Sequence, residues 1–208
     1  MPKLEPMPED HMYRAHGIYL LKSQHPEIRR LKRHYQPTVH GNRTWNSSFL
    51  LMDYLTAKPV RKGARVLEIG CGWGATAVFC ASRFKARVTG LDIDRDVFPF
   101  LEAMADLNDV TIDTLTRKFE NLSSRQLGAF HTILGSDICF WDSMVKPLYN
   151  MVSRAFRGGA RRCVFTDPGR PTFYEFVDLC ATRYSAKLTQ WYSLEPNRFE
   201  GEVVEIKR

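Results

Sequence analysis

The sequence has 208 residues, of which 44% are hydrophobic and 25% charged, and its formal net charge is +7. This length suits one α/β domain with an N-terminal extension and leaves little room for a second full domain. No apolar run approaches the length of a membrane span, and the start of the chain lacks the apolar stretch of a signal peptide. We therefore expect a soluble, cytoplasmic protein with no membrane partner.

The first 43 residues are basic. They hold eight Lys or Arg residues against four acidic ones, and five of the six histidines. Residues 28–35 are the densest basic patch, which is either a solvated helix face or a contact for an acidic substrate. We predict helical patches over residues 11–35, interrupted at Gly17 and Pro26.

From residue 44 onward, helix patterns alternate with short apolar runs. A helix over 44–55, capped by Asn46 or Ser47, leads into a strand over 66–69. The alternation then predicts the following elements: a helix over 76–84, a strand over 86–92, a helix over 95–107, strands over 110–116 and 130–134, a helix over 143–156, a strand over 160–166, a helix over 172–183, and a closing hairpin of 187–192 with 202–207.

Strands that alternate with helices favour a doubly wound, mostly parallel sheet. The predicted fold is therefore an α/β, Rossmann-like sheet of seven strands with a C-terminal antiparallel hairpin. We divide the chain into a main domain over residues 44–208 and an N-terminal extension over residues 1–43. The extension is expected to act as a lid on a substrate pocket, or else only to cover the sheet.

The five cysteines show no C-x-x-C pair and lie mostly in apolar runs (Cys71, Cys80, Cys139, Cys163 and Cys180). This distribution is typical of small core residues in a reducing compartment and does not suggest a disulfide framework or a zinc site. The histidines have no metal-ligand spacing either. We expect no metal.

A glycine-rich turn follows the predicted strand over 66–69. Glycine allows the chain to turn tightly and lets a ligand approach the backbone, and the N–H groups of the next helix favour a polar or anionic group there. A second apolar run ends at Asp92, about 20 residues after the turn, where a ribose-binding carboxylate belongs. Asp94 is the competing position.

Two ligand classes use such a turn. Gly70, Gly72 and Ala75 satisfy the dinucleotide spacing G-x-G-x-x-G/A. Glu68, however, places a carboxylate at the strand end, where it would face positive charge on a ligand. The resulting E-x-G-x-G-x-G pattern over residues 68–74 resembles motif I of the Rossmann-like S-adenosyl-L-methionine (AdoMet) methyltransferases. The closing hairpin is also similar to theirs and argues against a dehydrogenase.

The resemblance implies how AdoMet would be held. Glu68 would lie near its methionine end, Gly70 and Gly72 would make room for it, and Asp92 would bind the ribose. The turn after the third strand has Lys118 about where many methyltransferases place an acid for adenine, so the Phe119 ring and backbone groups would serve instead. Further cofactor-binding candidates in the same motifs are Cys71, Trp73, Ile93, Asp137 and Trp45.

Two later motifs narrow the resemblance. Asp137-Ile138-Cys139-Phe140 is similar to the (D/E)-x-x-(Y/F) motif of the family 16 protein-lysine methyltransferases, and Trp45 lies in a helix like the one that precedes their motif I. The D-P-G-R element at 167–170 resembles the branch that methylates the electron transfer flavoprotein β subunit. On this analogy Asp137 would orient a substrate amine or accept its proton, and Phe140 would wall the methyl channel. The alternatives are a helix cap at Asp137 and a core position at Phe140.

Trp141 would help to exclude water on the same analogy, or would belong to the core. Asp167 and Arg170 are read equally well as a turn and its salt-bridge partner. The predicted function is AdoMet-dependent methylation of a lysine side chain in a protein, with S-adenosyl-L-homocysteine (AdoHcy) as the product.

Three alternatives remain. The acceptor is a small molecule methylated on nitrogen or oxygen, or it is RNA, which the basic charge favours only weakly because no asparagine-proline-proline-aromatic motif is present. A non-catalytic AdoMet-binding partner protein is the third. The sequence does not predict the oligomeric state or the number of methyl groups transferred.

Overall fold

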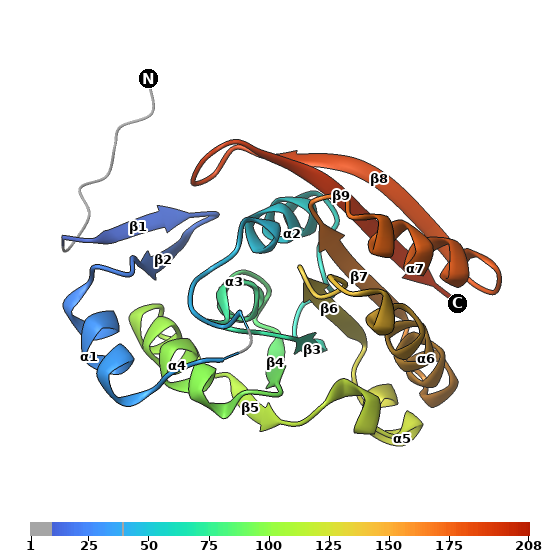
Figure 1. Cartoon of the computed structure of the whole chain (residues 1–208), viewed down its shortest axis with the longest axis horizontal. Helices are drawn as coiled ribbons and strands as arrows, with labels where there is room; N and C mark the ends of the chain where they lie inside the picture. The colour runs from blue at the N-terminus through green and yellow to red at the C-terminus, as the bar shows by residue number, and fades with distance from the viewer. Residues whose placement is uncertain (1–9, 39) are drawn as a thin grey trace.

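The computed structural model describes residues 10–38 and 40–208, and a seven-stranded sheet lies at its centre (Figure 1). The strand order is β5-β4-β3-β6-β7-β9-β8, with β9 antiparallel to both of its neighbours and the other pairings parallel. The strands are β3 (Arg65–Ile69), β4 (Arg87–Asp92), β5 (Asp113–Thr116), β6 (Thr132–Ser136), β7 (Arg162–Asp167), β8 (Ser185–Ser193) and β9 (Phe199–Lys207). The predicted fold class and the closing hairpin are confirmed.

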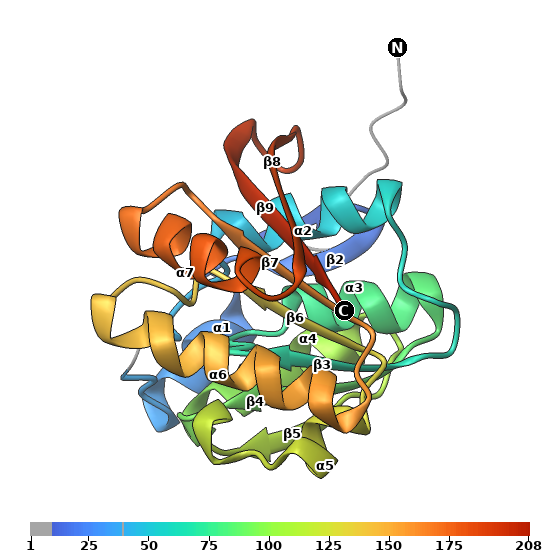
Figure 2. The same ribbon diagram turned by 90° about the vertical axis from the view of Figure 1, so that its right-hand side faces the viewer.

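Helices cover both faces of the sheet (Figure 2). One apolar cluster joins one sheet face to α1 (Pro26–His34), α2 (Asn46–Ala57), α3 (Ala75–Phe84) and α4 (Phe98–Leu107). The other joins the opposite face to α5 (Ser124–Gly128), α6 (Asp142–Gly158) and α7 (Pro171–Ala181). No helix among the described residues is long and apolar enough to cross a membrane.

The two central strands, β3 and β6, lie side by side at the point where the strand order changes direction. The chain leaves β3 through α3 toward β4 and β5 on one side, then returns to place β6 on the other side of β3. All five residues of β6 are buried, so the pair is fixed by apolar contacts on both faces. The crevice outside the carboxyl ends of β3 and β6 is where open α/β sheets bind ligands.

The predicted helical patches before residue 25 are wrong. β1 (Met12–Ala15) and β2 (Ile18–Leu21) form a two-stranded antiparallel hairpin instead. His16 and Gly17 between them both have positive φ, 50° and 85°, which is the conformation of a type I′ hairpin turn. The first nine residues of the predicted lid lie outside the described part of the chain.

Pro26 starts a helix where a break was expected. It occupies the first turn of α1, where its missing N–H costs no intrahelical bond. The hairpin and α1 pack against the main domain, since Tyr19 exchanges two backbone hydrogen bonds of 2.8 Å with the Asn108 side chain. The extension is therefore part of one of the two apolar cores.

Smaller differences concern element ends. α2 begins after Trp45, which makes no side-chain capping bond, so the predicted cap at Asn46 or Ser47 is wrong. β5 begins at Asp113 and not at 110, because it is an edge strand and its pairing with β4 starts there. α5 was not predicted, although Ser123 and Gln126 form a capping box at its start.

Candidate active site

A pocket of about 410 Å³ opens at the carboxyl ends of β3, β4, β5 and β6. Its walls come from the loops after these four strands and from the segment between α1 and α2. Eight of the predicted site residues line it: Trp45, Gly70, Gly72, Asp92, Ile93, Phe119, Asp137 and Phe140. Glu68, Cys71 and Trp73 do not.

The glycine turn requires glycine for its backbone conformation. Gly70, Gly72 and Gly74 have φ values of 61°, 50° and 72°, which residues with a Cβ rarely adopt. A Cβ on Gly72 would meet nothing within 4 Å, whereas one on Gly74 would lie 2.5 Å from Leu101 Cγ. Gly72 thus borders open pocket space, and Gly74 is packed against α4.

Asp92 ends β4 and joins that strand to the glycine turn. Its Oδ2 accepts a hydrogen bond of 3.0 Å from Gly72 N, and its Oδ1 accepts one of 3.0 Å from Asp94 N. Burial raises the pKa of Asp92, while these backbone bonds oppose the rise. Each carboxylate oxygen keeps a lone pair for a ligand hydroxyl.

The competing acid, Asp94, is engaged elsewhere. Its Oδ2 accepts hydrogen bonds of 2.6 Å from Thr38 N and 3.0 Å from Thr38 Oγ1. Gln36 N likewise donates to Asp96. These bonds hold the segment after α1 against the end of β4, and that segment supplies His40, which sequence reasoning missed, to the pocket wall.

Glu68 lies in β3 beneath the turn and is only 2% exposed. Its Oε2 is buried without a hydrogen-bond partner among the described residues. Burial raises the pKa of this carboxyl to about 8. A buried acid with an unused oxygen is suited to a positively charged ligand group nearby.

Trp73 and Cys71 were predicted to touch the cofactor, and the structure places their side chains in the core. The Trp73 ring stacks on Phe100 at 5.0 Å between centroids, and its Nε1 donates to Gly41 O at 2.8 Å. Cys71 is 6% exposed, and its backbone N–H donates to Leu91 O. Both residues support the pocket from behind its wall.

The end of the pocket near β5 is built on Phe119, which is largely buried. Its carbonyl already accepts hydrogen bonds from Leu122 N and Arg154 Nη2, whereas its ring offers an apolar face to a ligand. Lys118 and Glu120 flank it on the pocket wall. Many methyltransferases have an adenine-binding acid at about the position of Lys118. In this chain the pocket wall has an acid two residues later, at Glu120.

The opposite end of the pocket holds a carboxylate beside aromatic rings. Asp137 follows the last residue of β6, has a φ of 57°, and donates its N–H to Thr166 O at 2.9 Å. The Phe140 ring packs edge-on against the rings of Trp141 and His40, with distances between ring centroids of 4.6 Å and 5.3 Å. Trp141 is 54% exposed, which is unusual for so large an apolar side chain.

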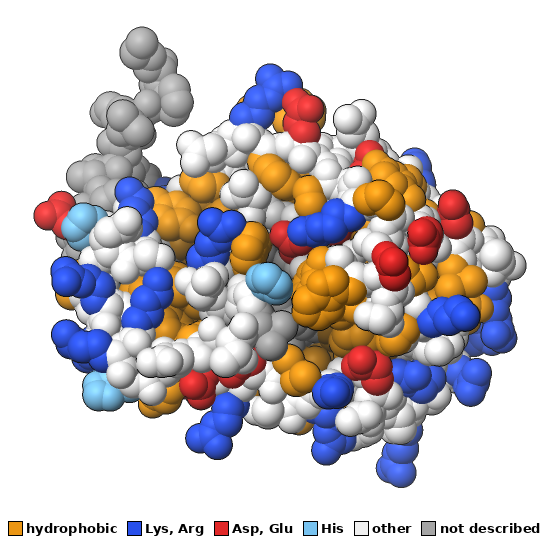
Figure 3. Space-filling view, viewed as in Figure 1, with side chains coloured by type: hydrophobic (Ala, Val, Ile, Leu, Met, Phe, Trp, Pro, Cys, Tyr) orange, Lys and Arg blue, Asp and Glu red, His pale blue; other side chains and the backbone are white. Residues whose placement is uncertain are grey.

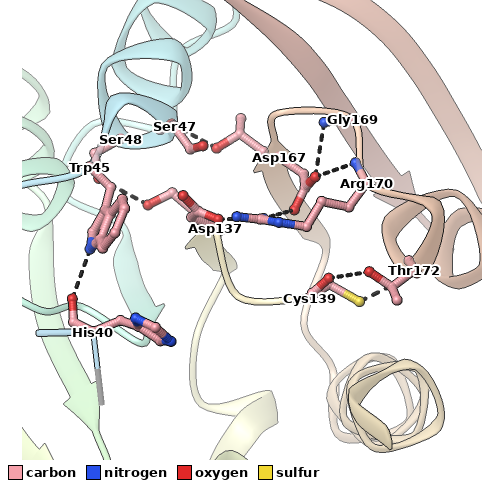
Figure 4. Close-up of polar contacts among 12 residues, drawn as sticks. His40, Trp45, Ser47, Ser48, Asp137, Cys139, Asp167, Gly169, Arg170 and Thr172 are labelled. Atoms are coloured by element: carbon pink, nitrogen blue, oxygen red, sulfur yellow. Dashed lines mark hydrogen bonds and ion pairs between the residues drawn. The ribbon is translucent and has the colours of Figure 1, made fainter. Parts of the chain in front are cut away.

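Trp45 closes this end from the side of α2. Its Nε1 donates a hydrogen bond of 2.8 Å to His40 O (Figure 4). The Arg43 guanidinium lies 4.0 Å from the centre of the Trp45 ring. The Ser48 and Ser136 hydroxyls, 3.0 Å apart, tie the start of α2 to the end of β6. The D-P-G-R element meets Asp137 here, because the Arg170 guanidinium contacts both Asp137 and Asp167.

Residues 66–159 match the family profile described as "Methyltransferase domain". Among solved structures, TrmN from Thermus thermophilus aligns with a TM-score of 0.60 at 13% identity, over 77% of this chain and 48% of that one. A methyltransferase from Pyrococcus furiosus aligns with a TM-score of 0.58 at 15% identity, over 76% and 82%. The profile match over these residues supports an AdoMet-dependent methyltransferase, and the structural similarities show that its fold is the Rossmann-like one.

Within this class the sequence is similar to the electron transfer flavoprotein β subunit lysine methyltransferases. Identity to the Xenopus laevis protein is 28% over 130 residues, 62% of this chain and 52% of that one. Identity to the Homo sapiens protein is 25% over 158 residues, which are 76% of this chain and 58% of that one. The chain thus matches little more than half of these relatives. It is also 30% identical over 82 residues to a ubiquinone biosynthesis O-methyltransferase of Xanthomonas campestris, 39% of this chain and 34% of that one.

The residues present fit AdoMet, the methyl donor of this class. The unpartnered buried Oε2 of Glu68 suits a cationic group, the space beside Gly72 admits a ligand against the backbone, and Asp92 has lone pairs for hydroxyls. Phe119 offers a ring for an aromatic base. When bound, AdoMet supplies the activated methyl group.

Proposed function

We propose that this chain transfers a methyl group from AdoMet to the ε-amine of a lysine in a protein. The observation that carries the proposal is the position of Asp137, whose carboxylate lines the same pocket as Gly70 and Gly72. An amine attacks a methyl group through its lone pair, so a hydrogen-bond acceptor at the far side of the nitrogen orients that lone pair. The similarity to lysine methyltransferases supports the same acceptor.

The aromatic rings beside Asp137 suit a long aliphatic side chain with a nitrogen at its end. Phe140 and Trp141 pack edge to face, and His40 contacts both of their rings. Such walls bury the methylene groups of lysine and exclude water from the nitrogen. Positioning and desolvation then provide most of the rate acceleration.

The same proposal gives residues 1–43 the role of a cover on the substrate side, with 44–208 as the catalytic domain. His40 and Gly41 line the pocket, and their segment is held by Asp94 and Asp96. Lys and Arg side chains gather over α1 and the N-terminal hairpin, on the face seen in Figure 3. These cations would favour an acidic polypeptide near the pocket mouth.

A small-molecule acceptor is the second candidate, favoured by the similarity to the ubiquinone biosynthesis O-methyltransferase. A pocket of about 410 Å³ is within the range of small-ligand sites. An O-methyltransferase needs a group that takes the proton of a hydroxyl, and Asp137 would then act as that base.

Transfer from methyl-labelled AdoMet into a cell extract separates these candidates. Counts are divided among protease-sensitive polypeptide, nucleic acid and small-molecule fractions. We expect label in a discrete polypeptide, absent with Asp137→Ala and retained with Asp113→Ala, a matched exposed acid on the edge strand β5. Label only in the small-molecule or nucleic acid fraction would refute the protein acceptor.

A further inference from the structure

One guanidinium joins carboxylates from the ends of two adjacent parallel strands. Arg170 Nη1 contacts Asp137 Oδ1, just after β6, and lies 2.7 Å from Oδ2 of Asp167, the last residue of β7. Figure 4 shows the Arg170 side chain extending between the two acids. The charged groups of Asp137, Asp167 and Arg170 form one cluster. It lies at the end of the pocket lined by Asp137 and Phe140, where the methyl acceptor would bind.

Asp167 fixes the place of this cation. Its side chain is 0% exposed, and its Oδ1 accepts hydrogen bonds of 2.9 Å from Gly169 N and 2.8 Å from Arg170 N. The loop that presents Arg170 is thus folded around the carboxylate that Arg170 pairs with. Arg170 itself is only 33% exposed, so water screens its charge less than that of a surface arginine.

The acceptor nitrogen would lie close to this cation. Asp137 Oδ1 is buried and forms an ion pair with Arg170, which leaves Oδ2 as the oxygen that would meet an acceptor in the pocket. Adding the hydrogen-bond lengths on either side of one carboxylate places an amine on Oδ2 within about 5–7 Å of the guanidinium. At that range a unit charge changes an amine pKa by about one unit in a medium of intermediate dielectric constant.

The charge of the cluster matters because only the neutral amine has a lone pair for methyl transfer. A lysine amine has an ordinary pKa of about 10.4, so it is almost entirely protonated near neutral pH. Two carboxylates alone would stabilise the ammonium further. Resting on the proposed function, we propose that Arg170 is a positioning residue that holds Asp137 in place and, through its charge, favours the neutral acceptor amine.

Other charged or titratable groups lie on the elements around Asp137 and Arg170. They are His40 and Arg43 before α2, Cys139 after β6, Asp142 at the start of α6, Tyr174 and Glu175 in α7, and Glu202 in β9. Burial raises the pKa of Cys139 to about 11, so this thiol is neutral over the working range. All of them remain in variants of Arg170, so a difference between two pH profiles isolates the guanidinium.

The test is the pH dependence of single-turnover methyl transfer at saturating acceptor, which reports the ionisation of the bound amine. The acceptor is the polypeptide labelled in the extract experiment. Arg170→Met should move the rising limb of the profile to higher pH by about one unit, with about tenfold slower transfer near pH 7. Arg170→Lys keeps the charge and should move it far less.

Two further variants guard against a merely structural effect. Asp167→Asn removes a negative charge from the cluster and should shift the profile in the opposite direction, which loosened packing cannot explain. Arg198→Met is the matched control, because Arg198, in the turn before β9, also pairs with an exposed carboxylate, that of Glu200 in β9. AdoHcy affinity measured by calorimetry should be unchanged in Arg170→Met and Arg170→Lys.

A slower Arg170→Met whose profile superimposes on that of the wild type would overturn the inference. The same holds if Arg170→Lys shifts as far as Arg170→Met. If Arg170→Met does not fold, equal profiles for Asp167→Asn and the wild type overturn it instead. A wild-type protein that labels no polypeptide would refute the proposed function, and the inference with it.

Discussion

Asp92 Oδ2 accepts a hydrogen bond of 3.0 Å from the backbone N–H of Gly72. The two residues are 20 positions apart: Asp92 is the last residue of β4, and Gly72 lies in the glycine turn that follows β3. The acid therefore has two tasks: it fixes the glycine turn, and it keeps lone pairs for the ligand.

Asp92→Asn should weaken AdoHcy binding by about tenfold or more. The amide has a single acceptor oxygen, so it cannot accept from both Gly72 N and Asp94 N and still meet a hydroxyl. Calorimetric titration with AdoHcy measures the affinity. Asp113→Asn, an exposed acid on β5, serves as the control, and equal affinities for both variants would contradict this assignment.

Gly72 and Gly74 offer a matched pair of substitutions. Gly74→Ala should lower the free energy of unfolding by about 2–4 kcal/mol, because a strained φ is combined with a clash against Leu101. Gly72→Ala has only the strained φ and should cost about 1–2 kcal/mol, yet it should lose more AdoHcy affinity because its Cβ points into open space. Urea denaturation and calorimetry test this, and the reverse ranking in stability would count against the account.

Glu68 should make stability depend on pH. Burial raises its pKa from 4.5 to about 8, so between these values the folded chain holds a proton that the unfolded chain has released. Its contribution to stability is therefore lost as pH rises through that window. Relative to Glu68→Gln, the wild type should lose on the order of 2–4 kcal/mol of unfolding free energy between about pH 5 and pH 8. Parallel stability curves in urea would contradict the raised pKa.

Trp73 and Trp45 should respond differently to truncation. Trp73→Ala removes a buried ring stacked on Phe100 and should cost about 3–5 kcal/mol of stability. Trp45 lines the pocket and is partly exposed, so Trp45→Ala should mainly slow methyl transfer. Thermal unfolding and the labelling assay are measured on both variants. A larger stability loss in Trp45→Ala would show that this tryptophan belongs to the core.

The sheet could be predicted because its strands are short apolar runs. The helices between them instead repeat their apolar residues every three to four positions. β3 and β6 are buried on both faces, so each reads as a continuous hydrophobic segment. The hairpin of β1 and β2 was missed for a local reason. Its turn depends on His16 adopting positive φ before Gly17, and histidine is not a usual signal for that conformation.

The pocket could be predicted only in part. Residues at strand ends, such as Asp92 and Asp137, were identified because parallel strands bring their carboxyl ends to one edge. His40 reaches the pocket because Asp94 anchors Thr38, a contact across more than fifty residues that no local pattern encodes. Trp73 was predicted to contact the cofactor because it lies inside the glycine motif. Its side chain instead stacks on Phe100, a contact across 27 residues that the motif does not encode.

The proposed acceptor is a lysine amine, so the decisive measurement is the chemical position of the transferred methyl group. The polypeptide labelled by the wild-type protein is hydrolysed to amino acids, and the labelled residue is identified by chromatography and mass spectrometry. We expect methylated lysine, which should be lost with Asp137→Ala and retained with Asp113→Ala. Label on an arginine, a histidine or a carboxyl group, or on no polypeptide at all, would contradict it.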